Sequence, residues 1–299
     1  MSVISIQSQV AHGHVGNSAA VFPMQHLGIQ VTAVPTTLLS NHPHYPTMRG
    51  RVLDANLLHD LLLGVEERGL VDNCSMLLTG YLGSAENGEV VAGFVERAKR
   101  RNPALRYCCD PVMGDADLGF FIDARLQELF RQRLVPLADI TTPNQFELEQ
   151  LVGFATPDVA ALEAGVNDLM GDGAKVVAVT GVGLSDSSAT HVETYAFEGG
   201  ATWKVSTPRL PCRPAGTGDL LTALFVSALV QGAAVPVALE TAVSATFAVL
   251  LNTARANLYE MPIVQSAKEF GRRKARFRAL VVRRGSAEDQ KRLISSPES

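Results

Sequence analysis

The chain carries its clearest chemical signal at residues 216–219, where Gly-Thr-Gly-Asp runs directly into an apolar stretch of helix length. Free backbone N–H groups and the positive end of the helix dipole make a helix start an anion site, and glycines let phosphate approach the backbone. A carboxylate there can take a proton from an alcohol that attacks the phosphate. The segment is therefore a candidate phosphoryl-transfer site, although a plain helix start with Asp219 as a favourable charge has the same pattern.

Two other segments place carboxylates where a phosphate-handling enzyme would need them. Asp110 and Asp115 follow an apolar run, and carboxylates at such a position can hold magnesium through its waters and orient the phosphates of a nucleotide. A turn with a second, solvated aspartate has the same sequence. Asn144 and Glu147 can face the same ligand, but their spacing of three residues is also that of a helix capping box.

The elements that would position these residues alternate along the chain. Short apolar runs are separated by amphipathic stretches of helix length, which predicts an α/β fold with a mostly parallel sheet covered by helices on both faces. The predicted strands are 3–6, 29–34, 75–78, 105–109, 138–141 and 175–180. The predicted helices are 18–27, 55–67, 86–100 and 124–133, with two more after Pro143 and Pro157.

The pattern changes after Gly183. Runs at 190–197 and 202–206 predict an antiparallel hairpin, three helices are expected from 219 to 274, and 277–282 is expected to close the sheet as an edge strand. No repeat, low-complexity linker or break in composition divides the chain. Residues 1–285 are therefore predicted to form a single domain, and 286–299 a disordered polar tail.

Polar residues follow four of the predicted strands. They are Ser8, Tyr81, Asp110 and Asn144. Because ligands of open α/β sheets bind beyond the carboxyl ends of the strands, these residues are expected to converge on one edge of the sheet.

Composition argues against several classes of function. A net charge of −4 and a pI near 6.0 argue against nucleic-acid binding. The mean hydropathy is +0.13 and no apolar run is long enough for a membrane span, so 238–251 is expected to be a buried helix. The four cysteines form no CxxC pair and no export signal is recognisable, which predicts a cytoplasmic protein with reduced thiols.

Familiar nucleotide and metal motifs are missing from the sequence. It contains neither GxxxxGK[ST] nor a GxGxxG after a strand, which argues against a Walker-type or dinucleotide-binding fold. The pairs His12/His14 and His42/His44 have no Cys or carboxylate at a spacing that would complete a zinc site.

Several segments match one known family in order over residues 3–282. They are 5–8, 13–20, 22–24, 40–45, 78–84, 109–115, 142–147 and 216–219. In these segments the chain resembles the pyridoxal kinases of the ribokinase superfamily. The Gly-Thr-Gly-Asp turn marks only the superfamily, whereas the opening Ser-Ile-Gln-Ser and the segment Gly-Tyr-Leu-Gly-Ser are specific to pyridoxal kinases. The resemblance implies a ribokinase-like three-layer α/β/α sandwich and ATP-dependent phosphorylation of the 5′-hydroxyl of pyridoxal.

The resemblance also implies roles for individual residues. Asp219 would be the general base, within an anion hole formed by Gly216, Thr217 and Gly218. The residues implied at the nucleotide are Asp110, Asp115, Thr142, Asn144, Glu147, Thr180 and Thr217. Magnesium would be held, through water, by Asp110 and Glu147. The residues implied at pyridoxal, besides Asp219, are Ser8, Pro43, His44 and Tyr81. The family further implies a homodimer and leaves open a monovalent cation such as K⁺.

The chain departs from the family in the loop after its second strand. Family members often carry Phe, Thr and Trp where this chain has Leu39, Pro43 and Met48. An aromatic wall has become aliphatic, so a broad vitamin-B6 kinase remains an alternative. A hydroxymethylpyrimidine kinase is disfavoured because its glycine-rich opening is missing. A binder of pyridoxal or its phosphate without turnover is disfavoured because it would not need Asp219.

Overall fold

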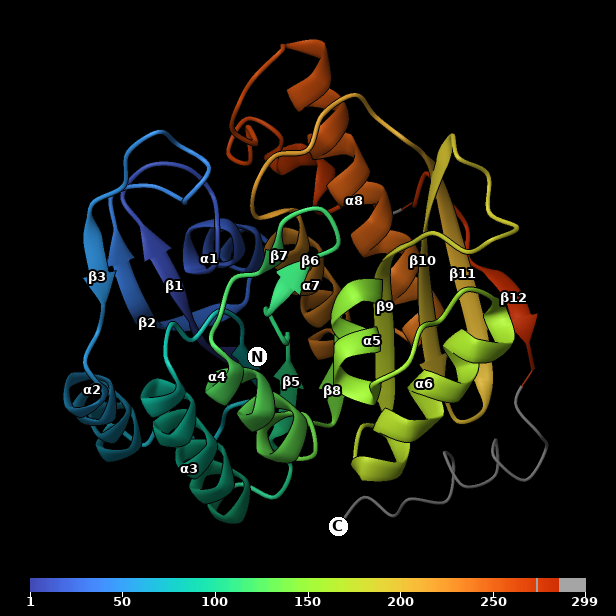
Figure 1. The fold of residues 1–299 in the computed structure, drawn as a ribbon. Coiled ribbons are helices and arrows are strands. Elements are labelled where there is room, and N and C mark those ends of the chain that lie inside the picture. The colour runs from blue at the N-terminus through green and yellow to red at the C-terminus, as the bar shows by residue number, and fades with distance from the viewer. Residues whose placement is uncertain (273, 285–299) are drawn as a thin grey trace.

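A ten-stranded sheet runs through the middle of the molecule (Figure 1). The structure is a computed structural model that describes residues 1–272 and 274–284, and the predicted tail at 286–299 lies outside them. The strands of the sheet are β1 (Ser2–Val10), β2 (Gln30–Leu39), β3 (Gly50–Val52), β4 (Met76–Thr79), β5 (Arg106–Cys109), β8 (Ile140–Thr141), β9 (Val176–Val182), β10 (His191–Glu198), β11 (Ala201–Pro208) and β12 (Leu280–Arg283).

The sheet is parallel at its centre and antiparallel at both edges. Its strand order is β12-β11-β10-β9-β8-β5-β4-β1-β2-β3. The neighbours from β9 to β2 pair in parallel, whereas β10, β11 and β12 on one side and β3 on the other pair antiparallel. The mostly parallel sheet and the late hairpin predicted from the sequence are both confirmed.

Helices cover both faces of the sheet and make the molecule a three-layer α/β/α sandwich (Figure 1). One face carries α1 (Asn17–His26), α7 (Thr217–Val230) and α8 (Val235–Arg255). The other face carries α2 (Ala55–Glu67), α3 (Ala85–Arg101), α4 (Ala124–Leu129), α5 (Gln145–Val152) and α6 (Val159–Asp172). Each layer of helices buries its apolar side against the sheet, which gives two separate hydrophobic cores.

Strand β5 shows how the sheet divides these cores. Its neighbouring residues Cys108 and Cys109 are both fully buried, but Cys108 packs in the core under α1, α7 and α8, and Cys109 in the opposite one. This alternation follows from the two-residue period of a strand. Both thiols are free.

Helix α8 is long and apolar enough to cross a membrane by length and composition, with a mean hydropathy of 1.5 over its most apolar window. It packs on α7 and against β10 and β11, and more than half of that window is buried inside the protein. Its apolar character therefore serves the second core, as expected for 238–251.

One expectation from the sequence is wrong. No third helix forms among the described residues 256–272, where a chain of turns with a 3₁₀ turn at Ala267–Glu269 follows α8 instead. Asn257 ends α8 in the left-handed region at φ 46°, and Pro262 offers no N–H to a new helix. A short hairpin of β6 (Gly114–Asp115) and β7 (Gly119–Phe120), which was not expected from the sequence, projects from the end of β5.

Candidate active site

The glycine turn lies where α7 begins, and the backbone around it is tightly constrained. Gly216 precedes the helix with φ 79°, in the left-handed region that favours glycine. A Cβ at Gly216 would lie 1.8 Å from the carbonyl oxygen of His14, whereas the same position at Gly218 faces open space. The hydroxyl of Thr217 donates to the carbonyl of Pro214 at 3.0 Å. The turn thus presents helix N–H groups without a side-chain cap to a space that an anion can enter.

Asp219 belongs to the first turn of the same helix. The surrounding protein desolvates its carboxyl group and raises its pKa above the usual 3.8, while a hydrogen bond from the N–H of Gly16 acts in the opposite direction. A carboxylate with a raised pKa beside an anion site is a suitable proton acceptor.

Asp110 directly follows β5 and is buried close to α7. The hydroxyl of Thr222, one turn beyond Asp219, lies 3.1 Å from Oδ2 of Asp110 and 3.0 Å from Oγ1 of Thr142. Burial and the charges of Glu147 and Asp219 raise the pKa of Asp110 well above its usual value. The structure therefore brings the predicted residues Asp110, Thr142, Glu147 and Asp219 together.

Asn144 and Glu147 form the capping box that their spacing allows. The side chain of Asn144 accepts the N–H of Glu147 at 2.8 Å, and Oε2 of Glu147 accepts the N–H of Asn144 at 2.9 Å. The same pair also holds the β6–β7 hairpin, because Oε1 of Glu147 accepts the N–H of Met113 at 2.9 Å and Asn144 donates to the carbonyl of Gly114. Both side chains therefore hold the backbone of the hairpin and of the start of α5 in place around the site.

The carboxylates in this framework repel one another. Burial raises the pKa of Glu147 to about 7, and the charge of Asp115 acts in the same direction. No three His, Cys, Asp or Glu side chains in the described ranges are placed to ligate one metal ion directly. A magnesium ion that keeps most of its waters and contacts one or two carboxylates and a phosphate fits Asp110 and Glu147, and it would offset the buried negative charge.

Ser8 lies within β1 rather than after it, which corrects the expectation from the sequence. The pairing of β1 with β2 shifts between Gln7 and Gln9, where Thr36 and Thr37 of β2 lie opposite the single residue Ser8. The extra residue of this bulge therefore belongs to β2, and Ser8 lies opposite it. The loop 11–16 packs on it, because a Cβ at Gly16 would lie 2.3 Å from Oγ of Ser8.

The other residues implied at pyridoxal lie farther apart. Pro43 and His44 are exposed in the loop 40–49 between β2 and β3, which we call the hairpin tip. Tyr81 follows β4, and burial together with the charge of Asp123 raises its pKa. No hydrogen bond within the described parts of the chain joins these three side chains to Ser8. Of the nucleotide residues, Thr180 lies beside Asn144, with which it forms an isolated parallel bridge.

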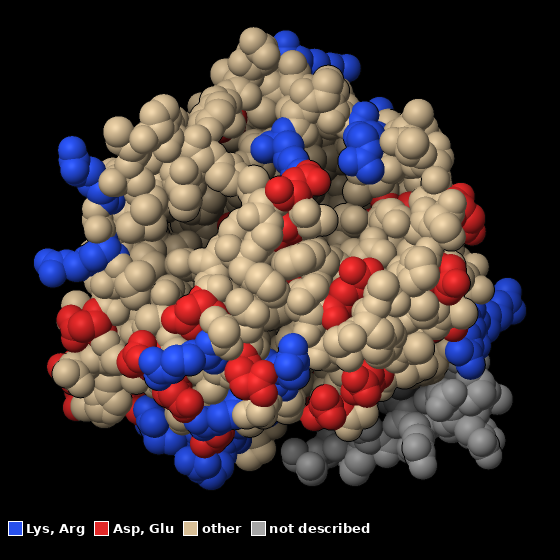
Figure 2. Space-filling view, in the orientation of Figure 1, with Lys and Arg blue, Asp and Glu red and all other residues tan. Residues whose placement is uncertain are grey.

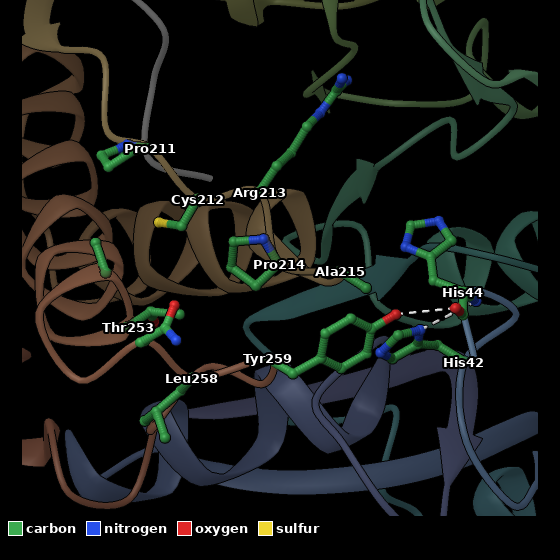
Figure 3. Close-up of a pocket in the computed structure, with 12 residues that line it drawn as sticks. His42, His44, Pro211, Cys212, Arg213, Pro214, Ala215, Thr253, Leu258 and Tyr259 are labelled. Atoms are coloured by element: carbon green, nitrogen blue, oxygen red, sulfur yellow. Dashed lines mark hydrogen bonds between the residues drawn. The ribbon is translucent and has the colours of Figure 1, made fainter. Parts of the chain in front are cut away.

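A cavity of about 310 Å³ separates the hairpin tip from the glycine turn (Figure 3). His42, His44 and Tyr259 line one side, and residues 211–215, which lead into Gly216, line the other. Tyr259 donates to the carbonyl of His44 at 2.9 Å. The hairpin tip therefore lies close to the backbone that forms the anion site.

Sequence reasoning missed three residues that assemble the site. Thr222 holds Asp110, Glu260 binds the hairpin tip, and Arg213 forms ion pairs with Asp115 and Asp117 of the β6–β7 hairpin. Acidic and basic side chains meet beside a hollow in the face drawn in Figure 2. Neither Glu260 nor Arg213 belongs to a recognisable motif, because their partners lie about 100 or more residues away.

Comparisons with known proteins identify similar sequences and similar structures. The family model described as phosphomethylpyrimidine kinase matches residues 69–263. A curated protein of Rubrobacter xylanophilus named pyridoxal kinase PdxY is 42% identical over 265 residues, which cover 88% of this chain and 91% of that one. A pyridoxal kinase from Entamoeba histolytica superposes with a TM-score of 0.87 at 25% identity, covering 94% of this chain and 99% of that one. The pyridoxal kinase of Leishmania donovani in complex with ADP and pyridoxamine gives 0.86 at 26% identity, covering 95% and 99%.

Proposed function

The chain belongs to the pyridoxal kinase family and phosphorylates pyridoxal with ATP, and on this premise we propose that Asp219 is the general base of the reaction. The observation that carries the proposal is the position of Asp219, a desolvated carboxylate in the first turn of a helix whose start is an open glycine turn. Phosphoryl transfer depends mainly on positioning and charge neutralisation, and this arrangement offers both.

The mechanism follows from the groups around the turn. Asp219 takes the proton of the 5′-hydroxyl of pyridoxal while the hydroxyl oxygen attacks the γ-phosphorus of ATP. The bond from this phosphorus to the β,γ-bridging oxygen breaks, and ADP leaves. The N–H groups of Gly216, Thr217 and Gly218 stabilise the charge on the transferred group. Asp110 and Glu147 would hold magnesium through water, and the ion would supply positive charge to the phosphates. The raised pKa of Asp219 suits it to keep the proton until product leaves.

The experiment that tests the function is the formation of pyridoxal 5′-phosphate from pyridoxal, ATP and magnesium by the purified protein. Pyridoxine, pyridoxamine and hydroxymethylpyrimidine are compared in parallel. We expect pyridoxal to have the highest kcat/KM, with Leu39, Pro43 and Met48 of the strand end and hairpin tip setting the ranking of the other vitamers. Binding of pyridoxal without consumption of ATP, or a preference for hydroxymethylpyrimidine, would overturn the assignment.

Proton and magnesium binding are expected to compete at the buried carboxylates. The pKa of Glu147 is about 7 in the folded protein against 4.5 for an unperturbed glutamate, so its proton stabilises the fold at low pH and this stabilisation is lost as pH rises through 7. The Tm of the ligand-free enzyme should therefore rise by about 2 °C or more between pH 8 and pH 6. Magnesium should raise Tm more at pH 8 than at pH 6.

Differential scanning fluorimetry measures both effects, with KCl at the same ionic strength as the control for screening. Asp110→Asn removes one of the repelling charges and can still accept a hydrogen bond from Thr222. This variant should show a weaker response to both pH and magnesium. An equal response to magnesium and KCl at both pH values would contradict a magnesium site at these carboxylates.

Ser8 is proposed to bind the pyridine ring, supported by its position near the end of β1, directly under the loop 11–16. Ser8→Ala should raise the KM for pyridoxal about 2- to 10-fold, the usual value of one neutral hydrogen bond, with the KM for ATP unchanged. Steady-state kinetics with each substrate varied in turn measures the split. An equal rise in the KM values for pyridoxal and ATP would indicate that Ser8 supports the structure of the site and does not bind the pyridine ring.

We also propose that the enzyme works in the cytoplasm as a homodimer. Leu57 and Leu61 lie one turn apart on α2 with 44% and 38% of their surface exposed, and a second copy could cover them. Light scattering after size-exclusion chromatography measures the mass in solution and so tests the dimer.

Activity assays with K⁺ replaced by Na⁺ test whether the enzyme requires a particular monovalent cation.

A further inference from the structure

Glu260, in the turns that follow α8, is the centre of a hydrogen-bond network that joins three segments of the chain. Its Oε1 accepts the hydroxyl of Tyr45 at 2.8 Å and lies 2.8 Å from Nε2 of His42. Its Oε2 accepts the backbone N–H of His14 at 3.2 Å. Burial acts to raise the pKa of Glu260, but the hydrogen bonds from Tyr45 and His42 outweigh it and lower the pKa. The carboxylate therefore stays ionised in this network.

The network orients the hairpin tip. Nδ1 of His42 lies 3.3 Å from the backbone nitrogen of His44 and accepts its N–H (Figure 3). Nε2 therefore carries the ring proton and donates to Glu260. Tyr259 stacks on the ring of His42 with centroids 5.8 Å apart and donates to the carbonyl of His44. Tyr259 and Glu260 thus hold both the backbone and the side chains of the tip.

The same carboxylate reaches the anion site through the loop 11–16. A Cβ at Gly13 would lie 2.8 Å from both oxygens of Glu260, so this loop packs directly on the carboxylate. The N–H of His14 bonds to Glu260, and the carbonyl of His14 packs against Gly216. A single residue, His14, therefore lies between Glu260 and the backbone of the glycine turn.

We propose that Glu260 is a positioning residue that holds the hairpin tip over the pyridoxal site and fixes the tip relative to the anion hole. It does so through Tyr45, His42 and the backbone of His14. The proposal rests on the proposed function, because that function places the tip over the substrate. It adds a side chain from the end of the chain, remote from every motif, to the residues on which pyridoxal binding depends.

The test compares Glu260→Gln, Tyr45→Phe and the double variant by steady-state kinetics. Gln keeps the size of the side chain but loses its charge and one acceptor oxygen, so the KM for pyridoxal should rise about fivefold or more. The KM for ATP should change less than about twofold. Tyr45→Phe should act in the same direction with a smaller effect. Because both single changes act on the same contact between Tyr45 and residue 260, the double variant should be little worse than Glu260→Gln.

Glu269→Gln is the matched control, since Glu269 is a similarly buried carboxylate on the same segment and pairs with Arg272. It should leave both KM values unchanged. A merely structural role of Glu260 would lower Tm while leaving the KM for pyridoxal within about twofold of wild type, and this result would overturn the proposal. The proposal would also be overturned if the increases in the KM for pyridoxal caused by the two single changes multiplied in the double variant. Tyr45 lies in an exposed loop, so its variant decides the question even if Glu260→Gln does not fold.

The wild-type assay keeps the two proposals distinguishable. If wild type does not phosphorylate pyridoxal, the proposed function fails before any variant is made. If wild type turns over and the Glu260 variants keep a normal KM for pyridoxal, only the positioning role fails.

Discussion

Asp219→Asn is expected to lower kcat by about 10²- to 10⁴-fold, the range for loss of a general base. The replacement keeps the shape of the side chain and an oxygen that can accept the N–H of Gly16. What it loses is the ability to take the proton of the attacking hydroxyl. Because desolvation raises the pKa of Asp219, the folded protein prefers an uncharged side chain at this position. The variant should therefore be at least as stable as wild type at pH 8.

The combination of lost turnover and retained stability is the decisive result. Calorimetric titration should show that Asp219→Asn binds pyridoxal and a non-hydrolysable ATP analogue with affinities near those of wild type. Thermal unfolding at pH 8 supplies the stability. Activity within about tenfold of wild type would remove Asp219 as the base, and loss of binding would indicate a ligand-positioning role instead.

Gly216→Ala is expected to abolish activity and to destabilise the protein. Its φ of 79° costs an alanine about 1–2 kcal/mol, and the new Cβ would lie 1.8 Å from the carbonyl oxygen of His14. Because that neighbour is backbone, the turn or the loop 11–16 must move, which adds about 1–3 kcal/mol. Either movement displaces the N–H groups of the anion hole, so kcat should fall by about 10²-fold or more.

Gly28→Ala separates the two costs. Gly28 follows α1 with φ 80°, almost the same as Gly216, but a Cβ there meets nothing within 4 Å. It should lose only the conformational part, about 1–2 kcal/mol, and keep full activity. Chemical denaturation measures both variants. Equal destabilisation of the two variants would mean that a Cβ placed against the carbonyl oxygen of His14 adds no cost at Gly216.

The central part of the fold was predictable because it depends on local patterns. Continuous apolar strands such as 176–179 alternate with amphipathic helices, and this pattern specifies a parallel sheet covered on both faces. The segment after Asn257 was mispredicted as a helix because its apolar residues are spaced like those of a helix. There the left-handed Asn257 and Pro262 decide the conformation. The two-residue strands of the β6–β7 hairpin are too short for an alternation of apolar and polar residues to be recognisable in the sequence.

The candidate site was predictable only where its residues form motifs. Asp110, Glu147 and Asp219 follow strands or open helices, and strand ends of one sheet converge by geometry. Thr222 is an ordinary helix residue until the fold brings Asp110 beside it, and Glu260 acts on residues more than 200 positions earlier. Such partners are set by tertiary packing, which leaves no trace in local spacing.

The contact between His14 and Gly216 also determines when the enzyme can acquire its activity during synthesis. Strand β1 pairs with β2 and β4, which both come early in the chain, so the strand pairing in this half of the sheet needs early residues only. The glycine turn and Glu260 come from the last third of the chain and close on a loop made at the beginning. Contacts of such large sequence separation form late, because a long loop must close first. A nascent chain can therefore pair β1, β2 and β4 well before it can hold the hairpin tip in place or complete the anion site.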